Sequence, residues 1–341
     1  LNKILMKSIA LIACSNGLGH TRRVFLLAKA LANKPLEVTI FAPLSDLVLL
    51  NYSDGFKRIK VIDFNTQTSI SKWNEVDTQN WYRLLPDLSE FDIVVCDNLI
   101  EVLKIRDDAW LSGSFFWHES INKFPQKLKK ESQDLLLKHK PNMISSSLFS
   151  SEALNKYTHL YEVGLFSDAE VNFSLSKDTS KNDILIACGK GGGVMSKTKD
   201  FIKRLSKEKS TIFDTVWIEP TLLPYDSPHW MKKAAFTNEM YQSLIASIIR
   251  PGVGTITDSL LVHSKVFLYY EPDNLEMIEN SNLIENSGLG INSVEIDNAW
   301  NDAIDYVESS GLQYEFRRKS RTLNINGAQE AADILASSLD Y

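Results

Sequence analysis

The stretch IIRPGVGTITDSL at residues 248–260 decides the fold class, because it joins an apolar run to an amphipathic segment through a glycine-rich turn. Apolar runs followed by turns and amphipathic segments recur along the chain, a pattern typical of parallel strands joined by crossover helices. We therefore expect an α/β protein. The turn also favours ligand binding, because glycines let a ligand approach the backbone and the following helix presents free amides.

The same alternation occurs on both sides of a polar stretch at 174–182, which we interpret as a linker between two domains. We expect two Rossmann-like doubly wound domains facing each other across a cleft, at 1–173 and 183–322, with a C-terminal helix at 323–341 returning to the first domain. The expected strands are 8–14, 37–41, 60–64, 92–96, 114–117, 143–146, 183–188, 215–218, 247–249 and 266–269. The expected helices are 22–33, 197–208, 238–246, 255–262 and 275–286.

The composition is that of an ordinary globular protein, with 341 residues, 44% hydrophobic and 23% charged. It excludes disordered, collagen-like and disulfide-scaffold chains. A formal net charge of -6 argues against a nucleic-acid partner. Each of Cys14, Cys96 and Cys188 lies in or at the end of an apolar run, which predicts buried, reduced thiols in a cytoplasmic protein.

The N-terminal segment superficially imitates a secretory signal, with Lys3 and Lys7 ahead of the apolar run 9–14. The run is shorter than the roughly 7–15 apolar residues of such signals. Elsewhere no stretch approaches the roughly 18 apolar residues of a membrane span. We therefore expect a cytoplasmic protein.

The turn after the first expected strand, SNGLGHTRR at 15–23, is the first candidate site. It lacks G-x-G-x-x-G spacing, so dinucleotide binding is not supported. His20 is either a packed or capping side chain or a functional base, acid or hydrogen-bonding group, and its place after the first strand favours function. We expect Arg23 to face a carboxylate or phosphate nearby. Backbone and side-chain contacts to a ligand are expected from Asn16, Gly17 and Gly19.

Two further glycine-rich turns follow strands of the second domain. The stretch CGKGGG at 188–193 leaves amides open to a diphosphate or forms a flexible loop, and it lacks the ending of a P-loop. In the stretch at 248–260, Thr255 opens a helix whose first amides suit phosphate oxygens, and Asp258 suits a ribose hydroxyl. Asp273 and Asn274 precede another helix at the same expected edge.

Three weaker candidates lie in the first domain. Asp97 follows a buried strand and could orient His20, bind an acceptor or cap a helix. His118 and Glu119 end the expected strand 114–117, where they suit either a sugar site or a solvated strand end. No histidines lie at metal-ligand spacing from Glu271 and the next acidic residue, so we expect no metal site.

A lysine-rich segment, Ile121 to Lys140, predicts a basic amphipathic helix. Such a helix is either a solvated face or a peripheral contact with an anionic membrane, here the inner face of the cell membrane.

Across nearly the whole chain, the motifs resemble GT-B glycosyltransferases of the MurG type and their UDP-glycosyltransferase relatives. The family motif R-x-G-x-G-T-x-x-E is matched by Arg250, Gly252, Gly254 and Thr255, followed by Pro272, Asn280 and Gly288. The family's Glu corresponds to Asp258 and its Gln to Met277. The N-terminal G-x-G-H-x-x-R also resembles the motif of PseG, a nucleotide-sugar hydrolase whose histidine activates water.

The resemblance implies a nucleotide-sugar donor in the second domain and an acceptor in the first, with no cofactor and no metal. The implied donor contacts are Gly189, Gly191, Gly192, Gly193, Arg250, Gly252, Gly254, Thr255, Asp258, Asp273 and Asn274. The implied acceptor contacts are Asn16, Gly17, Gly19, Arg23, His118 and Glu119, and the implied catalytic residues are His20 and Asp97.

Three functions remain open at this point. The first is transfer of a sugar to a hydroxyl acceptor, such as a lipid-linked glycan, in bacterial cell-surface glycan synthesis, with His20 as general base. The second is PseG-like hydrolysis, in which water replaces the acceptor. The third is a GT-B protein that binds nucleotide or sugar without catalysis.

Overall fold

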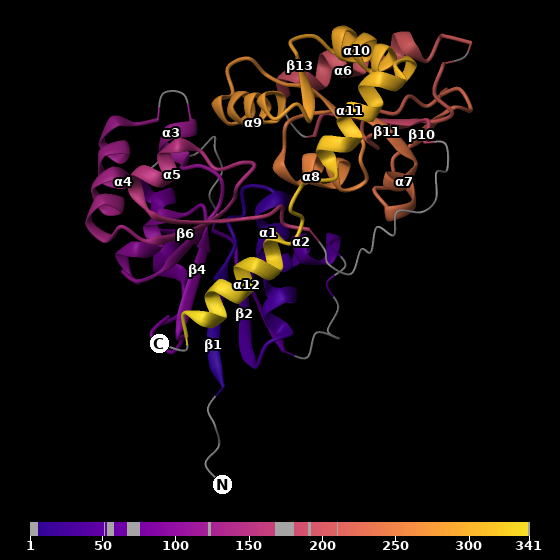
Figure 1. Ribbon diagram of the computed structural model, residues 1–341. Coiled ribbons are helices and arrows are strands. Elements are labelled where there is room, and N and C mark those ends of the chain that lie inside the picture. The colour runs from indigo at the N-terminus through magenta and orange to yellow at the C-terminus, as the bar shows by residue number, and fades with distance from the viewer. Residues whose placement is uncertain are drawn as a thin grey trace. The chain divides into compact units, whose positions relative to one another are not determined.

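The computed structural model describes residues 6–50, 52, 58–66, 76–121, 124–167, 181–189, 192–209 and 211–339. The chain forms two compact units, Leu1–Ala169 with Asn324–Tyr341, and Glu170–Leu323. Each unit contains one parallel sheet with helices on both faces (Figure 1). The expected α/β class, with two Rossmann-like domains, is confirmed.

The sheet of the first unit has seven parallel strands in the order β3-β2-β1-β4-β5-β6-β7. Its strands are β1 (Lys7–Ile12), β2 (Leu36–Ala42), β3 (Ile59–Asp63), β4 (Ile93–Asp97), β5 (Trp110–Ser112), β6 (Asn142–Ser146) and β7 (His159–Val163). Its helices are α1 (Leu18–Ala32), α2 (Leu44–Leu49), α3 (Trp117–Ser120), α4 (Gln126–His139), α5 (Glu152–Tyr157) and α12 (Gly327–Ser337), with 3-10 helices at Val76–Leu84 and Ile100–Lys104.

Alternation along the strands divides the first unit into two apolar cores. Ile9 and Leu11 of β1 belong to the core beneath α1 and α12. Ala10 and Ile12 belong to the opposite core, beneath α4 and α5. Because both faces are covered, the strands are apolar on both sides, as expected for a parallel sheet.

The C-terminal helix α12 packs beside α1 on the first unit, as Figure 1 shows in yellow. Its start is held by backbone bonds: Gly327 N–H donates to the carbonyl of Leu165 at 3.0 Å. Glu330 accepts from the backbone N–H of Gly164 at 2.9 Å and from the Asn324 side chain at 2.8 Å. These contacts fix α12 to the end of β7.

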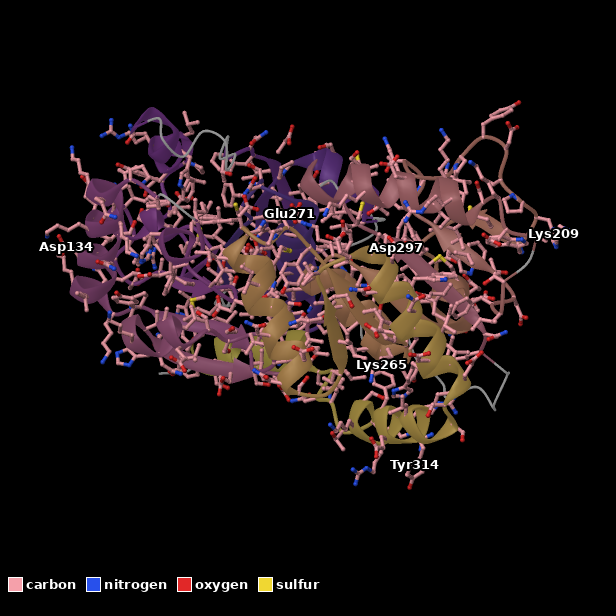
Figure 2. The ribbon with its side chains drawn as sticks, turned by 90° about the horizontal axis from the view of Figure 1, so that it is seen from above. Asp134, Lys209, Lys265, Glu271, Asp297 and Tyr314 are labelled. Carbon is pink, nitrogen blue, oxygen red and sulfur yellow. The ribbon has the colours of Figure 1, made fainter. Side chains whose placement is uncertain are left out.

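The second unit repeats the same strand order, β10-β9-β8-β11-β12-β13, with all pairs parallel. Its strands are β8 (Asp183–Ala187), β9 (Val216–Ile218), β10 (Met231–Lys233), β11 (Leu244–Ile249), β12 (Lys265–Tyr269) and β13 (Gly290–Ser293). Its helices are α6 (Gly192–Leu205), α7 (Asn238–Ser243), α8 (Val253–Leu261), α9 (Leu275–Asn286), α10 (Ile296–Glu308) and α11 (Ser310–Ser320). Asp297, labelled in Figure 2, pairs with Arg204 at 2.7 Å and so links α10 to α6.

Some of the expected elements were wrong. The expected strand 114–117 is not a strand: β5 ends at Ser112, and Trp117 begins α3. Phe115 and Phe116 are buried through tertiary packing, so their aromatic run imitates a strand. The expected helix 238–246 ends at Ser243, because Leu244 already belongs to β11. The short strands β7, β10 and β13 were not predicted.

Gly327 provides a test of how α12 is attached. A Cβ on residue 327 would overlap the carbonyl oxygen of Gly164, which is backbone and cannot move aside. Gly327→Ala should therefore destabilise the first unit by about 1–3 kcal/mol. Gly311→Ala is the matched control, since its nearest neighbour would be 4.0 Å away and alanine favours the helix. Urea unfolding measures both variants, and equal stability of the two would contradict this attachment.

Candidate functional site

In each unit, the strand order reverses between the two central strands, β1 and β4 in the first and β8 and β11 in the second. Ligands of doubly wound sheets bind beyond the carboxyl ends of the strands at this switch point. His20 follows β1 and Asp97 ends β4, so both lie at the switch point of the first unit. The loops after β8 and β11 hold the glycine-rich motifs of the second unit.

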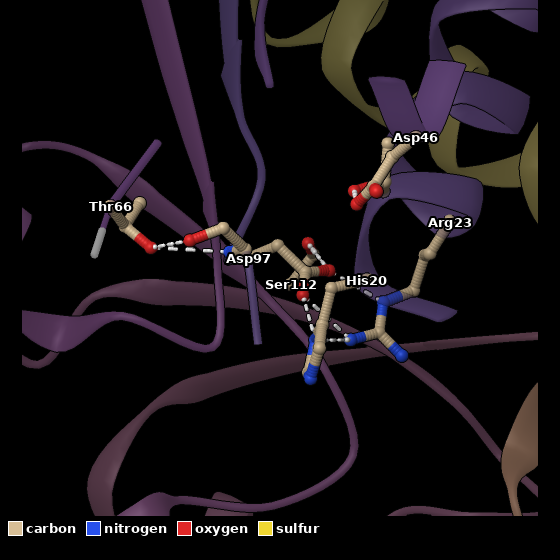
Figure 3. A network of polar contacts seen from close by, with 8 residues as sticks. His20, Arg23, Asp46, Thr66, Asp97 and Ser112 are labelled. Carbon is tan, nitrogen blue, oxygen red and sulfur yellow. Dashed lines mark hydrogen bonds and ion pairs between the residues drawn. The ribbon is translucent and has the colours of Figure 1, made fainter. Parts of the chain in front are cut away.

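Asp97 is the centre of a polar network in the first unit (Figure 3). Its carboxylate is fully buried and accepts from His20 Nδ1 at 2.6 Å. Arg23 binds it with two hydrogen bonds, from Nε at 2.6 Å and from Nη2 at 2.9 Å. The hydroxyl of Ser112, at the end of β5, donates to it at 3.0 Å. Every lone-pair direction of this buried carboxylate is therefore directed at a donor.

The charge state of Asp97 follows from this environment. Burial raises the pKa of the Asp97 carboxyl, but the Arg23 charge and the hydrogen bonds from His20 and Arg23 outweigh burial and hold it below the ordinary value. The carboxylate is therefore ionised at neutral pH and can only accept hydrogen bonds. It follows that Nδ1 of His20 carries a proton and that Nε2 of the neutral ring is the acceptor.

His20 is positioned to use this Nε2 atom. It lies in the first turn of α1, its side chain is 13% exposed, and its ring centre is 5.7 Å from that of Trp117. Among the described residues, no hydrogen bond reaches Nε2. An oriented imidazole with a free basic nitrogen is the arrangement of a general base supported by a carboxylate.

The loop that precedes His20 has space beside its glycines and one buried amide group without a hydrogen bond among the described residues. Ser15 is anchored by the buried hydroxyl of Thr66, which accepts from its backbone N–H at 3.2 Å (Figure 3). Gly17 has φ 138°, a conformation that favours glycine, and a Cβ on Gly17 or Gly19 would meet nothing within 4 Å. Nδ2 of Asn16 is buried without a hydrogen bond among the described residues. The loop therefore presents unused donors and space for a ligand.

Arg23 was expected to contact the acceptor, and in the structure it binds Asp97. Its guanidinium is bound to Asp97 through both Nε and Nη2, and its side chain is 13% exposed. It faces a carboxylate, and its charge keeps Asp97 ionised. We therefore describe Arg23 as a positioning residue.

His118 and Glu119 do not end a strand, because both belong to α3. His118 is buried against aromatic rings: it stacks on Phe116 at 5.6 Å and meets Tyr157 edge-on at 6.1 Å. Glu119 accepts from Lys129 at 3.0 Å and from Gln133 at 3.1 Å. The contacts of Glu119 join α3 to α4, and those of His118 pack α3 against the aromatic core.

Because His118 is buried, we expect the stability of the first unit to fall in acid. Burial lowers the pKa of His118 from 6.5 to about 4. Between these values the unfolded chain binds a proton that the native protein does not, so stability falls as the pH falls, by about 1.4 kcal/mol per pH unit. His118→Phe should reduce the stability lost between pH 7 and pH 5, measured by urea unfolding followed by tryptophan fluorescence. His159→Gln, at an exposed histidine of β7, is the control, and an unchanged loss in His118→Phe would contradict the assignment.

In the second unit, the turn after β8 is joined to the neighbouring strands. Gly189 has φ 64°, and its backbone N–H donates to Glu219 Oε2 at 2.8 Å. Gly192 and Gly193 already belong to the first turn of α6. Gly191 lies outside the described residues. A Cβ on Gly193 would come within 2.8 Å of the Glu271 side chain, so glycine permits a close approach there.

The turn after β11 leads into α8 with Gly252 at its N-cap. Gly254 and Thr255 lie in the first turn, whereas Asp258 lies beyond it. Arg250 Nε is 3.0 Å from Glu271 Oε2, so the arginine is ion-paired. No acidic residue occupies the first turn of α8.

The next loop supports this region from β12. The Asn274 side chain accepts from Met277 N–H at 3.3 Å and so caps α9, and Asp273 precedes it. Asn280 Nδ2 donates to the carbonyl of Pro251 at 3.0 Å, which ties α9 to the turn after β11. In the structure, the side chains of Asn274 and Asn280 therefore hydrogen-bond to backbone groups of the loops in which the donor site is expected.

Sequence analysis missed two residues of these networks, Ser112 and Glu219. Ser112 completes the ring of donors around Asp97, and Glu219 holds Gly189. Both lie where a strand ends, and this position was the only feature of the sequence that could have marked them as site residues. Because the expected strand 114–117 was displaced from β5, Ser112 was not recognised as a residue at a strand end.

Two other expectations concern metals and membranes. Among the described ranges, no group of three or more His, Cys, Asp or Glu side chains could hold a metal ion. Within the same ranges, no helix is both long and apolar enough to cross a membrane. The three cysteines are buried.

The lysine-rich segment forms α4, apart from Lys123, which lies outside the described residues. Its apolar side chains Leu128 and Leu136 are buried in the core. Lys130 pairs with Asp134, which lies on the outer side of α4 (Figure 2). The outer face of α4 is therefore charged.

No protein-family model matches the sequence, and no curated protein matches it significantly. Solved structures do match. The glycotransferase of kitacinnamycin has a TM-score of 0.69 at 10% identity, covering 98% of this chain and 99% of that chain. Arabidopsis thaliana UGT89C1 complexed with quercetin has a TM-score of 0.67 at 10% identity, covering 98% and 100%. CalG4, the calicheamicin glycosyltransferase, has a TM-score of 0.62 at 14% identity, covering 98% and 99%. At these identities the similarity shows the fold, which is that of GT-B glycosyltransferases.

Proposed function

We propose that the protein is a glycosyltransferase that moves a sugar from a nucleotide-sugar donor to a hydroxyl acceptor. The observation that carries the proposal is the His20–Asp97 pair at the switch point of the first unit. The fold is shared with glycosyltransferases, among them UGT89C1, which was also solved with UDP. Fold alone does not define an activity, so the proposal depends on this pair.

In the proposed reaction, His20 acts as the general base. Nε2 takes the proton of the acceptor hydroxyl as its oxygen bonds to the anomeric carbon of the sugar. The bond from that carbon to the phosphate oxygen breaks, and the nucleotide leaves with the electron pair. The ionised Asp97 stabilises the imidazolium that forms, and Arg23 keeps Asp97 ionised.

The second unit is proposed to bind the donor. The departing phosphate gains negative charge, and amides at a helix N-terminus stabilise such charge without a metal ion. Gly252, Gly254 and Thr255 place these amides at the start of α8, beside the turn after β8. Donor binding without a divalent cation is part of the proposal.

We extend the proposal to a cytoplasmic enzyme whose acceptor is a bacterial cell-surface glycan, on the motif resemblance to MurG. A peripheral membrane contact would rest on the lysine charges of α4 and on Leu137, which is 61% exposed, because Leu128 and Leu136 are buried.

The first test is thermal stabilisation by UDP, dTDP, GDP and CMP, each with and without magnesium. A ligand that binds only the folded state raises the unfolding midpoint. We expect a rise of several degrees with one of these nucleotides, unchanged when magnesium is removed by chelation. Absence of any rise would favour a non-catalytic protein, and a rise that needs magnesium would contradict the metal-independent donor site.

The second test separates catalysis from donor binding. His20→Ala should lower the rate of nucleotide release from the matching nucleotide sugar by about 100-fold or more, since general bases contribute at least that much. Stabilisation by the nucleotide should remain unchanged, because His20 belongs to the other unit. His159→Ala, at an exposed histidine on the edge strand β7, is the control.

The same assay separates the two reactions that this base could support. Release of free sugar in the absence of any acceptor, at a rate that acceptors do not raise, would establish a hydrolase. Near-normal turnover of His20→Ala would exclude the base in either reaction.

A further inference from the structure

Several polar side chains of the first unit have buried atoms without a hydrogen bond among the described residues, and three of these residues, Asn98, Ser145 and Ser151, are neighbours in the fold. Oδ1 and Nδ2 of Asn98 both lack a partner, as do the hydroxyls of Ser145 and Ser151. The exposed fractions are 3% for Asn98, 1% for Ser145 and 6% for Ser151. Buried polar groups are nearly always hydrogen-bonded, so a group of three that are not requires an explanation.

The three residues adjoin one short segment, Gly113 and Ser114. The Asn98 amide fills the space where Gly113 lacks a side chain, since a Cβ there would overlap Asn98 Oδ1. Gly113 N–H donates at 3.1 Å to the carbonyl of Ile144, the residue before Ser145. Ser151 N–H donates at 3.2 Å to the carbonyl of Ser114. The three residues therefore lie at the carboxyl ends of β4, β5 and β6, near Asp97.

The backbone supports the Asn98 side chain at a cost. Asn98 has φ 54°, a left-handed conformation that residues other than glycine rarely adopt and that asparagine tolerates best. Its backbone N–H is used, because it donates to the carbonyl of Ser112 at 2.8 Å. Local strain of this kind together with an unpaired amide is typical of functional positions.

We propose that Asn98, Ser145 and Ser151 form a subsite for the hydroxyl groups of a sugar residue in the acceptor. This inference rests on the proposed transferase function and names the chemical class of its acceptor. An amide and two hydroxyls can each donate and accept, as the hydroxyls of a sugar do. Asn98 follows Asp97 directly in the chain, so this part of the subsite is one residue from the carboxylate that binds His20.

The subsite favours a hydroxyl-rich acceptor over a flat aromatic one. Quercetin, bound by the Arabidopsis protein of the same fold, is a flat phenol. A site that leaves buried polar groups unpaired binds such a molecule poorly, since each group loses water and gains no partner. A sugar restores the missing hydrogen bonds.

The experiment is saturation-transfer difference NMR on the full chain, with the nucleotide that gives thermal stabilisation also present. The probes are the methyl glycosides of glucose, galactose, mannose and N-acetylglucosamine, with quercetin as the flat comparison. The variants are Asn98→Gly, which suits the left-handed backbone, and Ser145→Ala with Ser151→Ala. Ser150→Ala is the matched control, because its hydroxyl already donates to the carbonyl of Ser146 at 3.1 Å.

We expect at least one glycoside to bind the parent and the Ser150→Ala control, and to bind the other variants about tenfold more weakly. The unfolding midpoints of the two serine variants without ligand should not fall, because neither hydroxyl makes a hydrogen bond among the described residues. Asn98→Gly also empties the space beside Gly113, so its binding is measured well below its own unfolding midpoint. Binding of quercetin alone, or no glycoside binding, would overturn the subsite. Glycoside binding that the variants leave unchanged would also overturn it and would assign the three groups to ordered water. Nucleotide stabilisation reports the proposed function separately, so its failure is distinguishable.

Discussion

The buried carboxylate of Asp97 is the constraint on which the first unit depends. A fully buried charge costs several kcal/mol unless donors compensate it, roughly the whole margin of stability of a domain. The compensation comes from α1 through His20 and Arg23 and from β5 through Ser112. Satisfying one charge therefore ties the start of α1 to the ends of β4 and β5, and the same contacts orient the imidazole. Because the pKa of Asp97 lies below its ordinary value of 3.8, this stabilisation is complete at neutral pH and is lost only in strong acid.

The second unit applies the same topology to a different chemical task. Each sheet reverses its strand order at its centre, so each unit has its own switch point. In the first unit, one carboxylate binds an imidazole, a guanidinium and a hydroxyl. In the second, two carboxylates, Glu219 and Glu271, hold a backbone amide and an arginine. The first arrangement orients the His20 imidazole, and the second shapes glycine turns around the N-termini of α6 and α8.

Sequence patterns predicted the fold class because the central strands are buried on both faces and therefore form continuous apolar runs, as in β11, where all six residues are buried. The strands that were missed are short or partly exposed: β7 begins with the exposed His159, and β10 has only one buried residue. The aromatic run ending at Trp117 was misassigned because bulky residues fill a core equally well from a loop. Period-two patterns cannot distinguish such tertiary packing from a strand.

The candidate site was predictable where a titratable residue follows a strand, as His20 and Asp97 do. It was not predictable where the role of a residue depends on which side chain it contacts in the folded protein. Nothing local in the sequence shows that Arg23 is committed to Asp97, or that His118 is enclosed by aromatic rings. The same holds for the unpaired groups at Asn98, Ser145 and Ser151, since a buried serine is ordinary until its missing partner is seen. The network around Asp97 is fully satisfied, whereas the adjacent cluster is not. Rigidity beside unsatisfied hydrogen-bonding capacity is what a binding site requires, because the base must be held before the substrate arrives and the substrate must supply the missing contacts.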